Sequence, residues 1–389
     1  MGVNMDIDAA QNIDSIETES VCSRDRNINI SAADMVVQGA RRVNTSNAEN
    51  TSAFKNTSTV HNTSTIDNTG TADNISAGVN VAQSVKDVDL SVNFAGVRFK
   101  NPVVAASGTF GFGREYSEYY DISMLGGICV KGLTLKPRLG NKPPRIAETP
   151  MGMLNAVGFQ NPGVDAFISN ELPFLREHNT VVIANLTGDT VEEFALLAEK
   201  LSDAKVDILE VNVSCPNIKS GGIQFGTSPD AVASVTEAVK QRSRVPVMVK
   251  LSPNVTDISS IARAAEAAGA DALSLINTLL GMRINTSTRK PVLSNNTGGL
   301  SGPAVFPVAV RMVWQVYKAV KIPILGMGGV MHGDNAIEMM LAGAGLVGVG
   351  TANIAEPTAP LRIIKDIKEY LTSNEIDTAA ELTGKVILN

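Results

Sequence analysis

A cysteine flanked by amides lies directly after a short apolar run. The run is Ile208–Val211, and the residues that follow, Asn212–Asn217, include Cys215. An apolar run that breaks into polar residues and a proline predicts a buried strand whose last side chains enter a loop. A thiol there can move a proton, although a lone cysteine is more often a small buried hydrophobe. Chemistry is favoured here because other predicted strand ends carry residues suited to a planar heterocycle.

Amide side chains recur at the predicted strand ends and in the loops beyond them. They are Asn155, Asn185, Asn212, Asn217 and Asn277. An amide offers a donor and an acceptor together, which matches the alternating N–H and C=O edge of a pyrimidine or a flavin. Any one of them could be a turn or cap residue. If all of them converge, they form a site for a ring rich in imide groups and leave Cys215 as the candidate for moving a proton.

Two lysines end predicted strands that are otherwise apolar. Lys131 precedes Gly132, and Lys250 lies in the segment Val249–Pro253. The stem of such a lysine runs through the core before its ammonium group reaches the strand end, where the charge suits an anion. A reduced flavin ring fits Lys250, and a substrate carboxylate or the flavin fits Lys131. The alternative for either lysine is a salt bridge to a neighbouring acid.

Glycine pairs mark the last two predicted strands. Gly326–Gly329 and Gly348–Thr351 follow or end them. In barrel enzymes the loops after strands seven and eight often bind a phosphate, since glycines let backbone N–H groups approach its oxygens. Tight turns alone are the alternative, but two pairs in the two expected loops favour a cofactor phosphate. A third glycine turn, Gly298–Pro303, could close over the same ligand.

Short apolar strands alternate with amphipathic or alanine-rich helices after about residue 88. The predicted strands are Val103–Ala106, Gly127–Lys131, Val181–Leu186, Ile208–Val213, Val247–Leu251, Ala272–Ile276, Ile324–Met327 and Leu346–Val349. The predicted helices are Val191–Leu201, Pro229–Arg242, Ile258–Ala268, Ala304–Val320, Asn335–Leu341 and Pro357–Leu371. This alternation predicts an α/β fold, a (β/α)8 TIM barrel whose strand ends all face one mouth.

The first part of the chain has a different composition. Its tripeptides Asn-Thr-Ser recur every six residues from Asn44, and so polar a tract cannot offset its ordering entropy. We expect residues 1–87 to be a disordered Asn/Thr/Ser-rich extension and residues 88–389 to be one barrel domain. Several tripeptides also match the N-glycosylation acceptor. A surface or adhesive protein is therefore the rival class, and glycans on Asn50 or Asn56 would identify it.

Composition narrows the function classes. The 389 residues are 44% hydrophobic with a net charge of −6, which favours neither a nucleic-acid surface nor a membrane protein. No window reaches the roughly 18 apolar residues of a membrane span, and no secretory signal is recognisable, so we expect a cytoplasmic protein. The three cysteines, Cys22, Cys129 and Cys215, are too few for the thiolates of an iron–sulfur cluster. We expect no metal on this chain.

From about Leu90 to Leu371 the chain resembles the class 1 dihydroorotate dehydrogenases, flavoproteins of pyrimidine synthesis, and within them the 1B branch. The resemblance rests on motifs that occur in the family's order. They are Ala106–Gly111, Val130–Thr134, Asn155–Gly163, Asn212–Asn217, Lys250–Asn254, Ile276–Thr278, Gly299–Pro303 and the two late glycine pairs.

The resemblance implies the ligands of this mouth. It implies FMN contacts at Ser107, Lys131, Gly132, Asn185, Asn212, Lys250, Ile276, Gly302, Gly328, Gly329, Gly350 and Thr351. It implies dihydroorotate or orotate contacts at Lys131, Asn155, Ala156, Val157, Gly158, Phe159, Asn212, Asn277 and Thr278, and Asn217 is expected to join them.

The resemblance also implies a mechanism and a partner. Cys215 takes a proton from C5 of dihydroorotate while a hydride passes from C6 to FMN, and the loop 218–227 is a lid that shields the thiol. Electrons then pass to NAD through a second subunit that carries FAD and a [2Fe-2S] cluster, in a heterotetramer with two copies of each subunit. The alternatives are a fumarate-linked class 1A enzyme and a dihydropyrimidine dehydrogenase subunit.

Overall fold

A closed barrel of parallel strands is the centre of the computed structural model, which describes residues 88–213 and 225–389. Its eight strands are β3 (Val103–Ala105), β4 (Gly127–Cys129), β7 (Val181–Leu186), β8 (Ile208–Asn212), β9 (Val247–Lys250), β10 (Ala272–Leu275), β15 (Ile324–Met327) and β16 (Leu346–Val349). Neighbours in the barrel follow one another in the chain, and β16 pairs with β3 to close it. The predicted (β/α)8 barrel is confirmed, and each predicted strand lies within two residues of an observed one.

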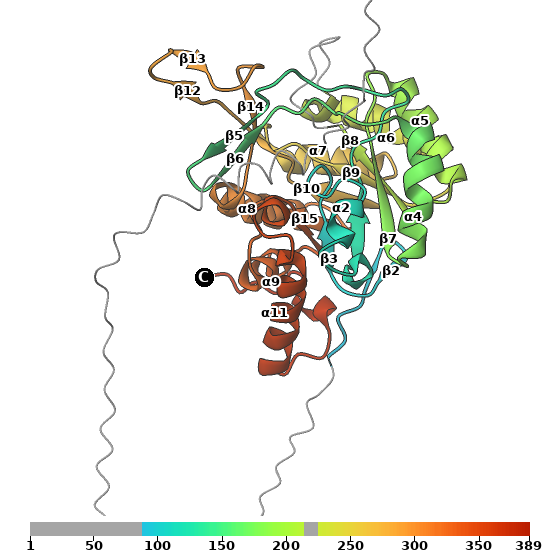
Figure 1. Cartoon of the computed structure of the whole chain (residues 1–389). Coiled ribbons are helices and arrows are strands. Elements are labelled where there is room, and N and C mark those ends of the chain that lie inside the picture. Colours follow the sequence, from blue (N-terminus) through green and yellow to red (C-terminus); the bar gives the residue numbers. More distant parts are fainter. Residues whose placement is uncertain (1–87, 214–224) are drawn as a thin grey trace, which may run out of the picture. The chain divides into compact units, whose positions relative to one another are not determined.

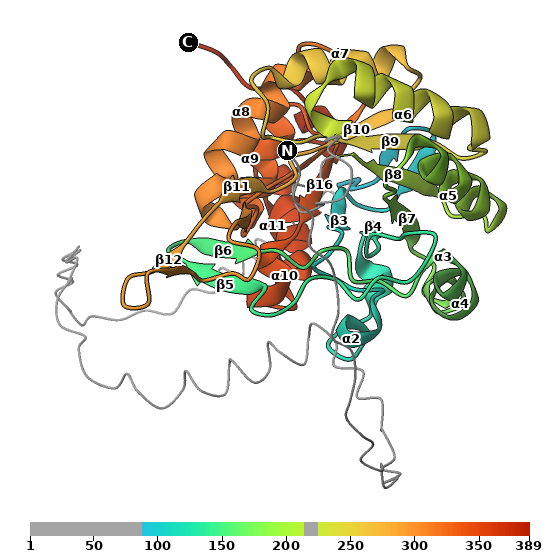
Figure 2. The same ribbon diagram turned by 90° about the horizontal axis from the view of Figure 1, so that it is seen from above.

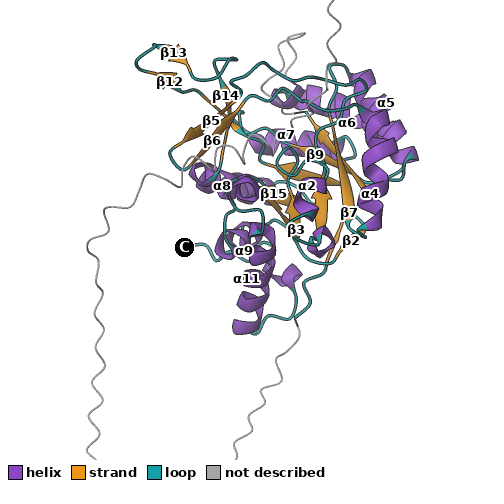
Figure 3. Cartoon of the chain, viewed as in Figure 1, coloured by secondary structure: helices purple, strands orange, loops and turns teal. Residues whose placement is uncertain are grey.

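Helices surround the barrel, as Figures 1 and 3 show. They are α2 (Arg114–Ser117), α3 (Val164–Ala166), α4 (Leu172–Glu177), α5 (Val191–Asp203), α6 (Pro229–Arg242), α7 (Ile258–Ala267), α8 (Phe306–Tyr317), α9 (Gly333–Leu341), α10 (Thr351–Ala355) and α11 (Ala359–Ser373). Their apolar faces pack on the strands, where large side chains such as Phe94, Phe110 and Phe194 are buried. All six predicted helices are present. The one predicted for 304–320 is shorter, because a 3₁₀ turn at Pro303–Val305 precedes α8.

The sequence fixes where several helices begin. Thr190 caps α5, since its Oγ1 accepts a hydrogen bond from the backbone N–H of Glu193 at 3.2 Å. Asp257 caps α7 in the same way through the N–H of Ser259 at 2.9 Å, and α6 opens with Pro229. Each cap satisfies a backbone donor that the helix itself leaves unpaired. Because each of these helices follows a barrel strand, the caps also set the length of the loops at the mouth.

A second, antiparallel sheet is built from two insertions and was not predicted. Its strands are β5 (Ile146–Thr149), β6 (Gly152–Asn155), β11 (Leu279–Gly281) and β14 (Gly298–Ser301), in the order β11-β14-β6-β5. The first two strands follow β4 in the chain, and the other two follow β10. Pairing of β6 with β14 therefore joins loops from two separate places at the mouth.

Two short hairpins complete the described residues. One is formed by β12 (Ile284–Asn285) and β13 (Lys290–Pro291), and it extends away from the barrel in Figures 1 and 2. The other is formed by β1 (Val92–Phe94) and β2 (Val97–Phe99), where Phe94 and Phe99 are buried and their rings meet edge to face. This second hairpin precedes β3, the first barrel strand, in the chain.

Candidate active site

Three of the predicted amides meet at the ends of the barrel strands β7, β8 and β10. Asn185 on β7 is fully buried, and Asn212, the last residue of β8, is 8% exposed. The side-chain amide of Asn212 donates to Oδ1 of Asn185 at 3.4 Å, and the amide of Asn277 donates to Oδ1 of Asn212 at 3.3 Å. These contacts form a row of alternating donors and acceptors, which is the chemistry an imide-rich ring requires.

The second sheet continues this amide row. Thr278 lies against Gly299 of β14, because a Cβ on Gly299 would be 2.0 Å from Thr278 Oγ1. Asn155 of β6 donates its side-chain amide to the carbonyl of Gly299 at 3.4 Å. Thr278 also donates a hydrogen bond within the row, from its backbone N–H to Oδ1 of Asn277 at 2.8 Å. Asn155, Asn277 and Thr278 therefore belong to one polar edge, although they come from two distant parts of the chain.

In the segment after Asn155, Phe159 reaches the site and Ala156 does not. Phe159 lies beside Gly132, where a Cβ would be 3.2 Å from the phenyl ring and 2.8 Å from Oδ1 of Asn185. Ala156 is instead buried in a small apolar cluster under the second sheet. The carbonyls of Ala156 and Val157 both accept hydrogen bonds from Asn141, at 2.9 Å each.

The backbone conformation of Gly158 and a backbone hydrogen bond of Lys131 are both defined in the structure. Gly158 has a positive φ of 75° and lies against the same Asn141 side chain. Lys131 follows β4, and its N–H donates to the carbonyl of Gly111 at 3.0 Å. The lysine is partly buried. Its backbone is thus fixed next to Gly132, on the side of the mouth where Asn185 and Phe159 lie.

The ammonium group of Lys250 connects three barrel strands. Its Nζ donates to Ser107 Oγ, just beyond β3, at 3.2 Å and lies 3.4 Å from Oε2 of Glu210 on β8. The side chains of Lys250 and Glu210 are only 5% and 0% exposed. The salt bridge that the sequence left open for this lysine is therefore present. Despite this salt bridge, the ammonium group remains at the strand end, because Lys250 pairs in register with Asn212, the last residue of β8.

Glu210 is a site residue that sequence reasoning missed. It also accepts hydrogen bonds from Ser274 Oγ at 2.7 Å, from Cys129 Sγ at 3.1 Å and from the amide of Asn185. Burial by itself raises its pKa, but the Lys250 ammonium and these three donors outweigh burial and hold the pKa of the carboxyl below its usual range. Glu210 is thus a buried carboxylate. A lone acid inside a strand predicted to be buried was the signal that could have found it.

Cys129, the one cysteine among the described residues, has the opposite character. Cys129 is fully buried at the end of β4. Burial, and next the negative charge of Glu210, raise the pKa of its thiol well above the usual value. Since the thiolate is the reactive form, Cys129 acts here as a hydrogen-bond donor and not as a base or nucleophile.

The glycine pairs lie together at the ends of the last two strands. Gly328 and Gly329, directly after β15, have φ values of 126° and 79°, which favour glycine. A Cβ on Gly328 would be 3.1 Å from the Ile276 side chain, and one on Gly329 would be 2.8 Å from the carbonyl of Gly302. Four predicted cofactor residues thus lie together, at positions where a side chain on either glycine would collide with its neighbours.

The neighbouring loop adds the last two predicted residues. A Cβ built on Gly350 would be 3.8 Å from Ala106 and 3.9 Å from Thr109, so this glycine lies in van der Waals contact with the loop that follows β3. Thr351 begins α10, and its hydroxyl donates to Ser301 Oγ of β14 at 2.9 Å. Glycines let backbone N–H groups approach an anion such as a phosphate.

Some predicted residues lie outside the described part of the chain. They are Cys215, Asn217 and positions 218–224 of the predicted lid. The remaining lid residues, Phe225–Thr227, form a 3₁₀ turn in which Phe225 packs edge to face on Phe194. The proposed extension 1–87 also lies outside the described residues, so its structure stays a prediction.

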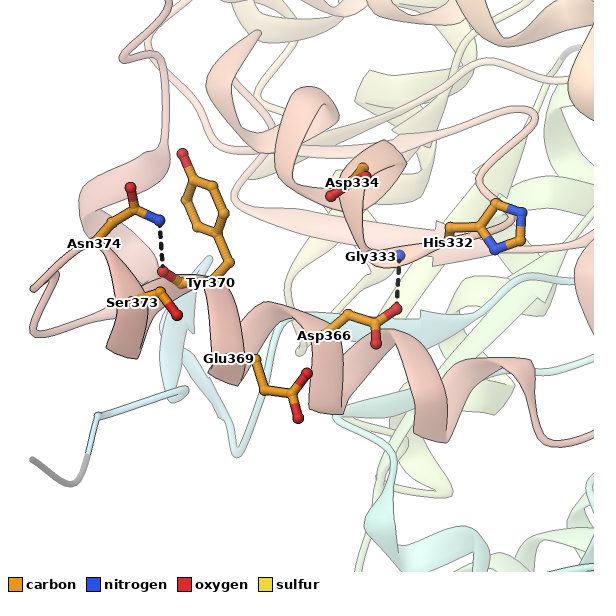
Figure 4. Close-up of a pocket in the computed structure, with 8 residues that line it drawn as sticks. All are labelled: His332, Gly333, Asp334, Asp366, Glu369, Tyr370, Ser373 and Asn374. Carbon is orange, nitrogen blue, oxygen red and sulfur yellow. Dashed lines mark hydrogen bonds between the residues drawn. The ribbon is translucent and has the colours of Figure 1, made fainter. Parts of the chain in front are cut away.

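A surface pocket next to α9 and α11 is separate from these residues. Figure 4 shows its lining, in which Asp366 accepts a hydrogen bond from the N–H of Gly333 at 3.1 Å and Asn374 donates to the Tyr370 carbonyl at 2.8 Å. The other lining residues are His332, Asp334, Glu369 and Ser373. None of the predicted site residues lines this pocket.

Within residues 88–213 and 225–389, no group of three or more His, Cys, Asp or Glu side chains could hold a metal ion. No helix in that same region is long and apolar enough to cross a bilayer. The expectations of no bound metal and of a cytoplasmic location stay predictions.

Comparisons with known proteins agree on one family. The family model described as dihydroorotate dehydrogenase matches residues 89–371. A relative from Alkaliphilus metalliredigens is 55% identical over 299 residues, covering 77% of this chain and 99% of the relative. A relative from Geobacter metallireducens is 56% identical over 301 residues with the same coverage. Both are named dihydroorotate dehydrogenase B (NAD(+)), catalytic subunit. The chain that forms this barrel and this polar mouth belongs to the dihydroorotate dehydrogenase family.

Proposed function

We propose that this chain oxidises dihydroorotate to orotate with FMN as its bound cofactor, in the synthesis of pyrimidine nucleotides. The observation that carries the proposal is the amide row Asn185–Asn212–Asn277, whose middle residue pairs in register with the buried Lys250. An imide-rich ring that accepts negative charge needs both features. The relatives that cover three quarters of this chain are named for the same reaction.

The residues at the mouth fit FMN. The donor set is suitable, because Lys250, Ser107 and the two buried amides offer hydrogen bonds and positive charge to a ring system. The partly exposed glycine backbone at Gly328, Gly329 and Gly350 suits the phosphate end. When bound, FMN supplies the two-electron acceptor of the reaction. The task of the protein's own groups is to hold the ring and to stabilise negative charge on it.

The substrate is proposed to bind along the outer part of the amide row. Asn155, Asn277 and Thr278 form one polar edge, and Asn212 joins that edge to the cofactor residues. Lys131 is the proposed partner of the substrate carboxylate, because its backbone is fixed beside Gly132 and Asn185. This carboxylate distinguishes dihydroorotate from uracil, so the lysine would set the choice between them.

Cys215 is proposed to take the proton from C5 of the substrate. It comes three residues after Asn212, where the chain leaves β8 on the mouth side. The described alternative is unsuitable, since Cys129 is buried below the mouth and its thiol resists ionisation. A base in the loop after β8 would approach the substrate from the side on which Asn212 lies.

Electrons are proposed to leave through a partner subunit that carries FAD and a [2Fe-2S] cluster, and so to reach NAD. The word "subunit" in the names of the relatives supports a partner. The three cysteines of this chain are too few for a cluster of its own. A heterotetramer with two copies of each subunit is the proposed assembly.

An anaerobic titration tests the proposal. The purified chain is titrated with dihydroorotate while the flavin absorbance is followed, and NAD or fumarate is then added with and without the co-purified partner. We expect bleaching in the wild-type protein, loss of bleaching in Cys215→Ala, and recovery with NAD only when the partner is present. Recovery with fumarate alone would replace the NAD-linked proposal, and bound FMN that never bleaches would refute the substrate.

A further inference from the structure

One acid and one base are buried together inside the barrel. Among the described residues, Glu210 and Lys250 are the only Asp, Glu, Lys or Arg side chains classed as buried. Burying charges is costly unless they are paired and hydrogen bonded, and a barrel interior of aliphatic side chains would be the cheaper arrangement. A charged pair at this place therefore calls for a reason other than stability.

Glu210 lies directly below the mouth. Side chains on a strand alternate between its two faces, so Glu210 and Asn212 on β8 point to the same side, with Glu210 one layer deeper. In the barrel register, Glu210 is opposite Asn185, and Asn212 is opposite Lys250. The acid thus stands beneath the two amides and the ammonium group that face the ring site.

The carboxylate is held by groups from four other strands. Its partners are Cys129 on β4, Asn185 on β7, Lys250 on β9 and Ser274 on β10. Two of these, Asn185 and Lys250, belong to the proposed FMN site. The other two, Ser274 and Cys129, bond to Glu210 from inside the barrel, and they leave the carboxylate no freedom to turn away from the mouth.

We propose that Glu210 is a positioning residue that orients Lys250 and Asn185 toward the flavin and lowers the reduction potential of bound FMN. This inference rests on the proposed function. A lone cation beside a ring favours the reduced, more negative form, whereas a carboxylate 3.4 Å behind that cation offsets much of its field. The pair thereby keeps the flavin oxidising enough to react and reducing enough to pass its electrons on.

The test is the two-electron reduction potential of FMN bound to variants of the full chain, measured by equilibrium with a reference dye. Glu210→Gln keeps the shape and removes the charge. We expect the preference for reduced over oxidised FMN to rise about tenfold, a positive shift of about 30 mV for a two-electron couple. Glu210→Asp keeps the negative charge but moves it away from Lys250, because aspartate is one methylene shorter. A smaller shift of the same sign is therefore expected. This variant provides the test if Glu210→Gln does not fold.

Two controls separate positioning from a general loss of charge. Asp207 precedes the first residue of β8, at the end of the strand away from the mouth, and forms a salt bridge with Arg176 at 2.7 Å. Asp207→Asn should therefore leave the reduction potential of FMN unchanged. In a Lys250→Met background, the shift caused by Glu210→Gln should fall to less than half. An equal shift with and without Lys250 would show that the acid does not act through the lysine, and it would overturn the proposal.

The outcomes separate this inference from the proposed function. Dihydroorotate must first bleach the wild-type flavin, which tests the function alone. If bleaching occurs and neither Glu210 variant changes the potential, the positioning role is wrong while the function stands. If the wild-type chain binds no FMN, both proposals fail.

Discussion

The charge of Lys250 can be removed with little change in the shape of its side chain, and the consequence for folding follows from its surroundings. Lys250→Met leaves the carboxylate of Glu210 buried with three neutral donors and no cation. Breaking a buried ion pair by removing one partner costs about 3–5 kcal/mol. The remaining hydrogen bonds offset part of this cost, so we expect a loss of about 3 kcal/mol in the free energy of unfolding near neutral pH.

The same variant should reverse the pH dependence that Glu210 contributes. In the wild-type chain the folded pKa of Glu210 is lowered, so its contribution is present above the unfolded pKa of about 4.3 and is lost as the pH falls through the folded pKa. Without the ammonium group, burial is no longer outweighed and the folded pKa rises above the unfolded one. The protonated acid is then favoured in the fold, and stability is lost as the pH rises through the raised pKa.

The assay is urea unfolding of the FMN-free chain, followed by fluorescence of its single tryptophan, Trp314 on α8. Measured at about pH 5 and about pH 8, the difference between wild type and Lys250→Met should be larger at the higher pH. Lys200→Met removes an exposed lysine paired with Asp165 and should cost less than about 1 kcal/mol at both pH values. The double variant with Glu210→Gln should recover part of the loss. An equal loss at both pH values would refute the argument that a buried carboxylate is left uncompensated.

Three further substitutions have clear expectations. Gly132→Ala places a Cβ 2.8 Å from Oδ1 of Asn185. The affinity for FMN, measured by fluorescence quenching, should therefore fall about tenfold or more, a loss of about 1.4 kcal/mol. An unchanged affinity would show that Gly132 is not part of the site. Asn277→Ala breaks the amide row at Asn212 and should raise the KM for dihydroorotate, whereas an effect on FMN binding alone would move Asn277 to the cofactor. Thr190→Ala removes the α5 cap and should cost about 1 kcal/mol in thermal unfolding without changing turnover.

Local patterns in the sequence were enough to predict the barrel and most of the residue types in the candidate site. A buried parallel strand is a short apolar run between breaks, and the eight such runs from Val103 to Val349 became the eight barrel strands. Since every strand of a (β/α)8 barrel ends at the same mouth, polar residues at strand ends, such as Asn212 and Lys250, could be assigned to one site before their contacts were known.

Pairing between distant segments was decided only in the tertiary structure. The polar edge that contains Asn155 and Thr278 depends on the pairing of β6 with β14. No local signal in the sequence predicts that these two inserted segments will pair. Glu210 shows the same limit inside the barrel. Along the chain it is one acid in an apolar run, and only closure of the barrel brings Lys250, Ser274 and Asn185 around it. The sequence by itself determines which residues stand at the end of each strand, because side-chain periodicity is local. It does not determine which strand ends become neighbours, because that depends on contacts between segments far apart in the chain.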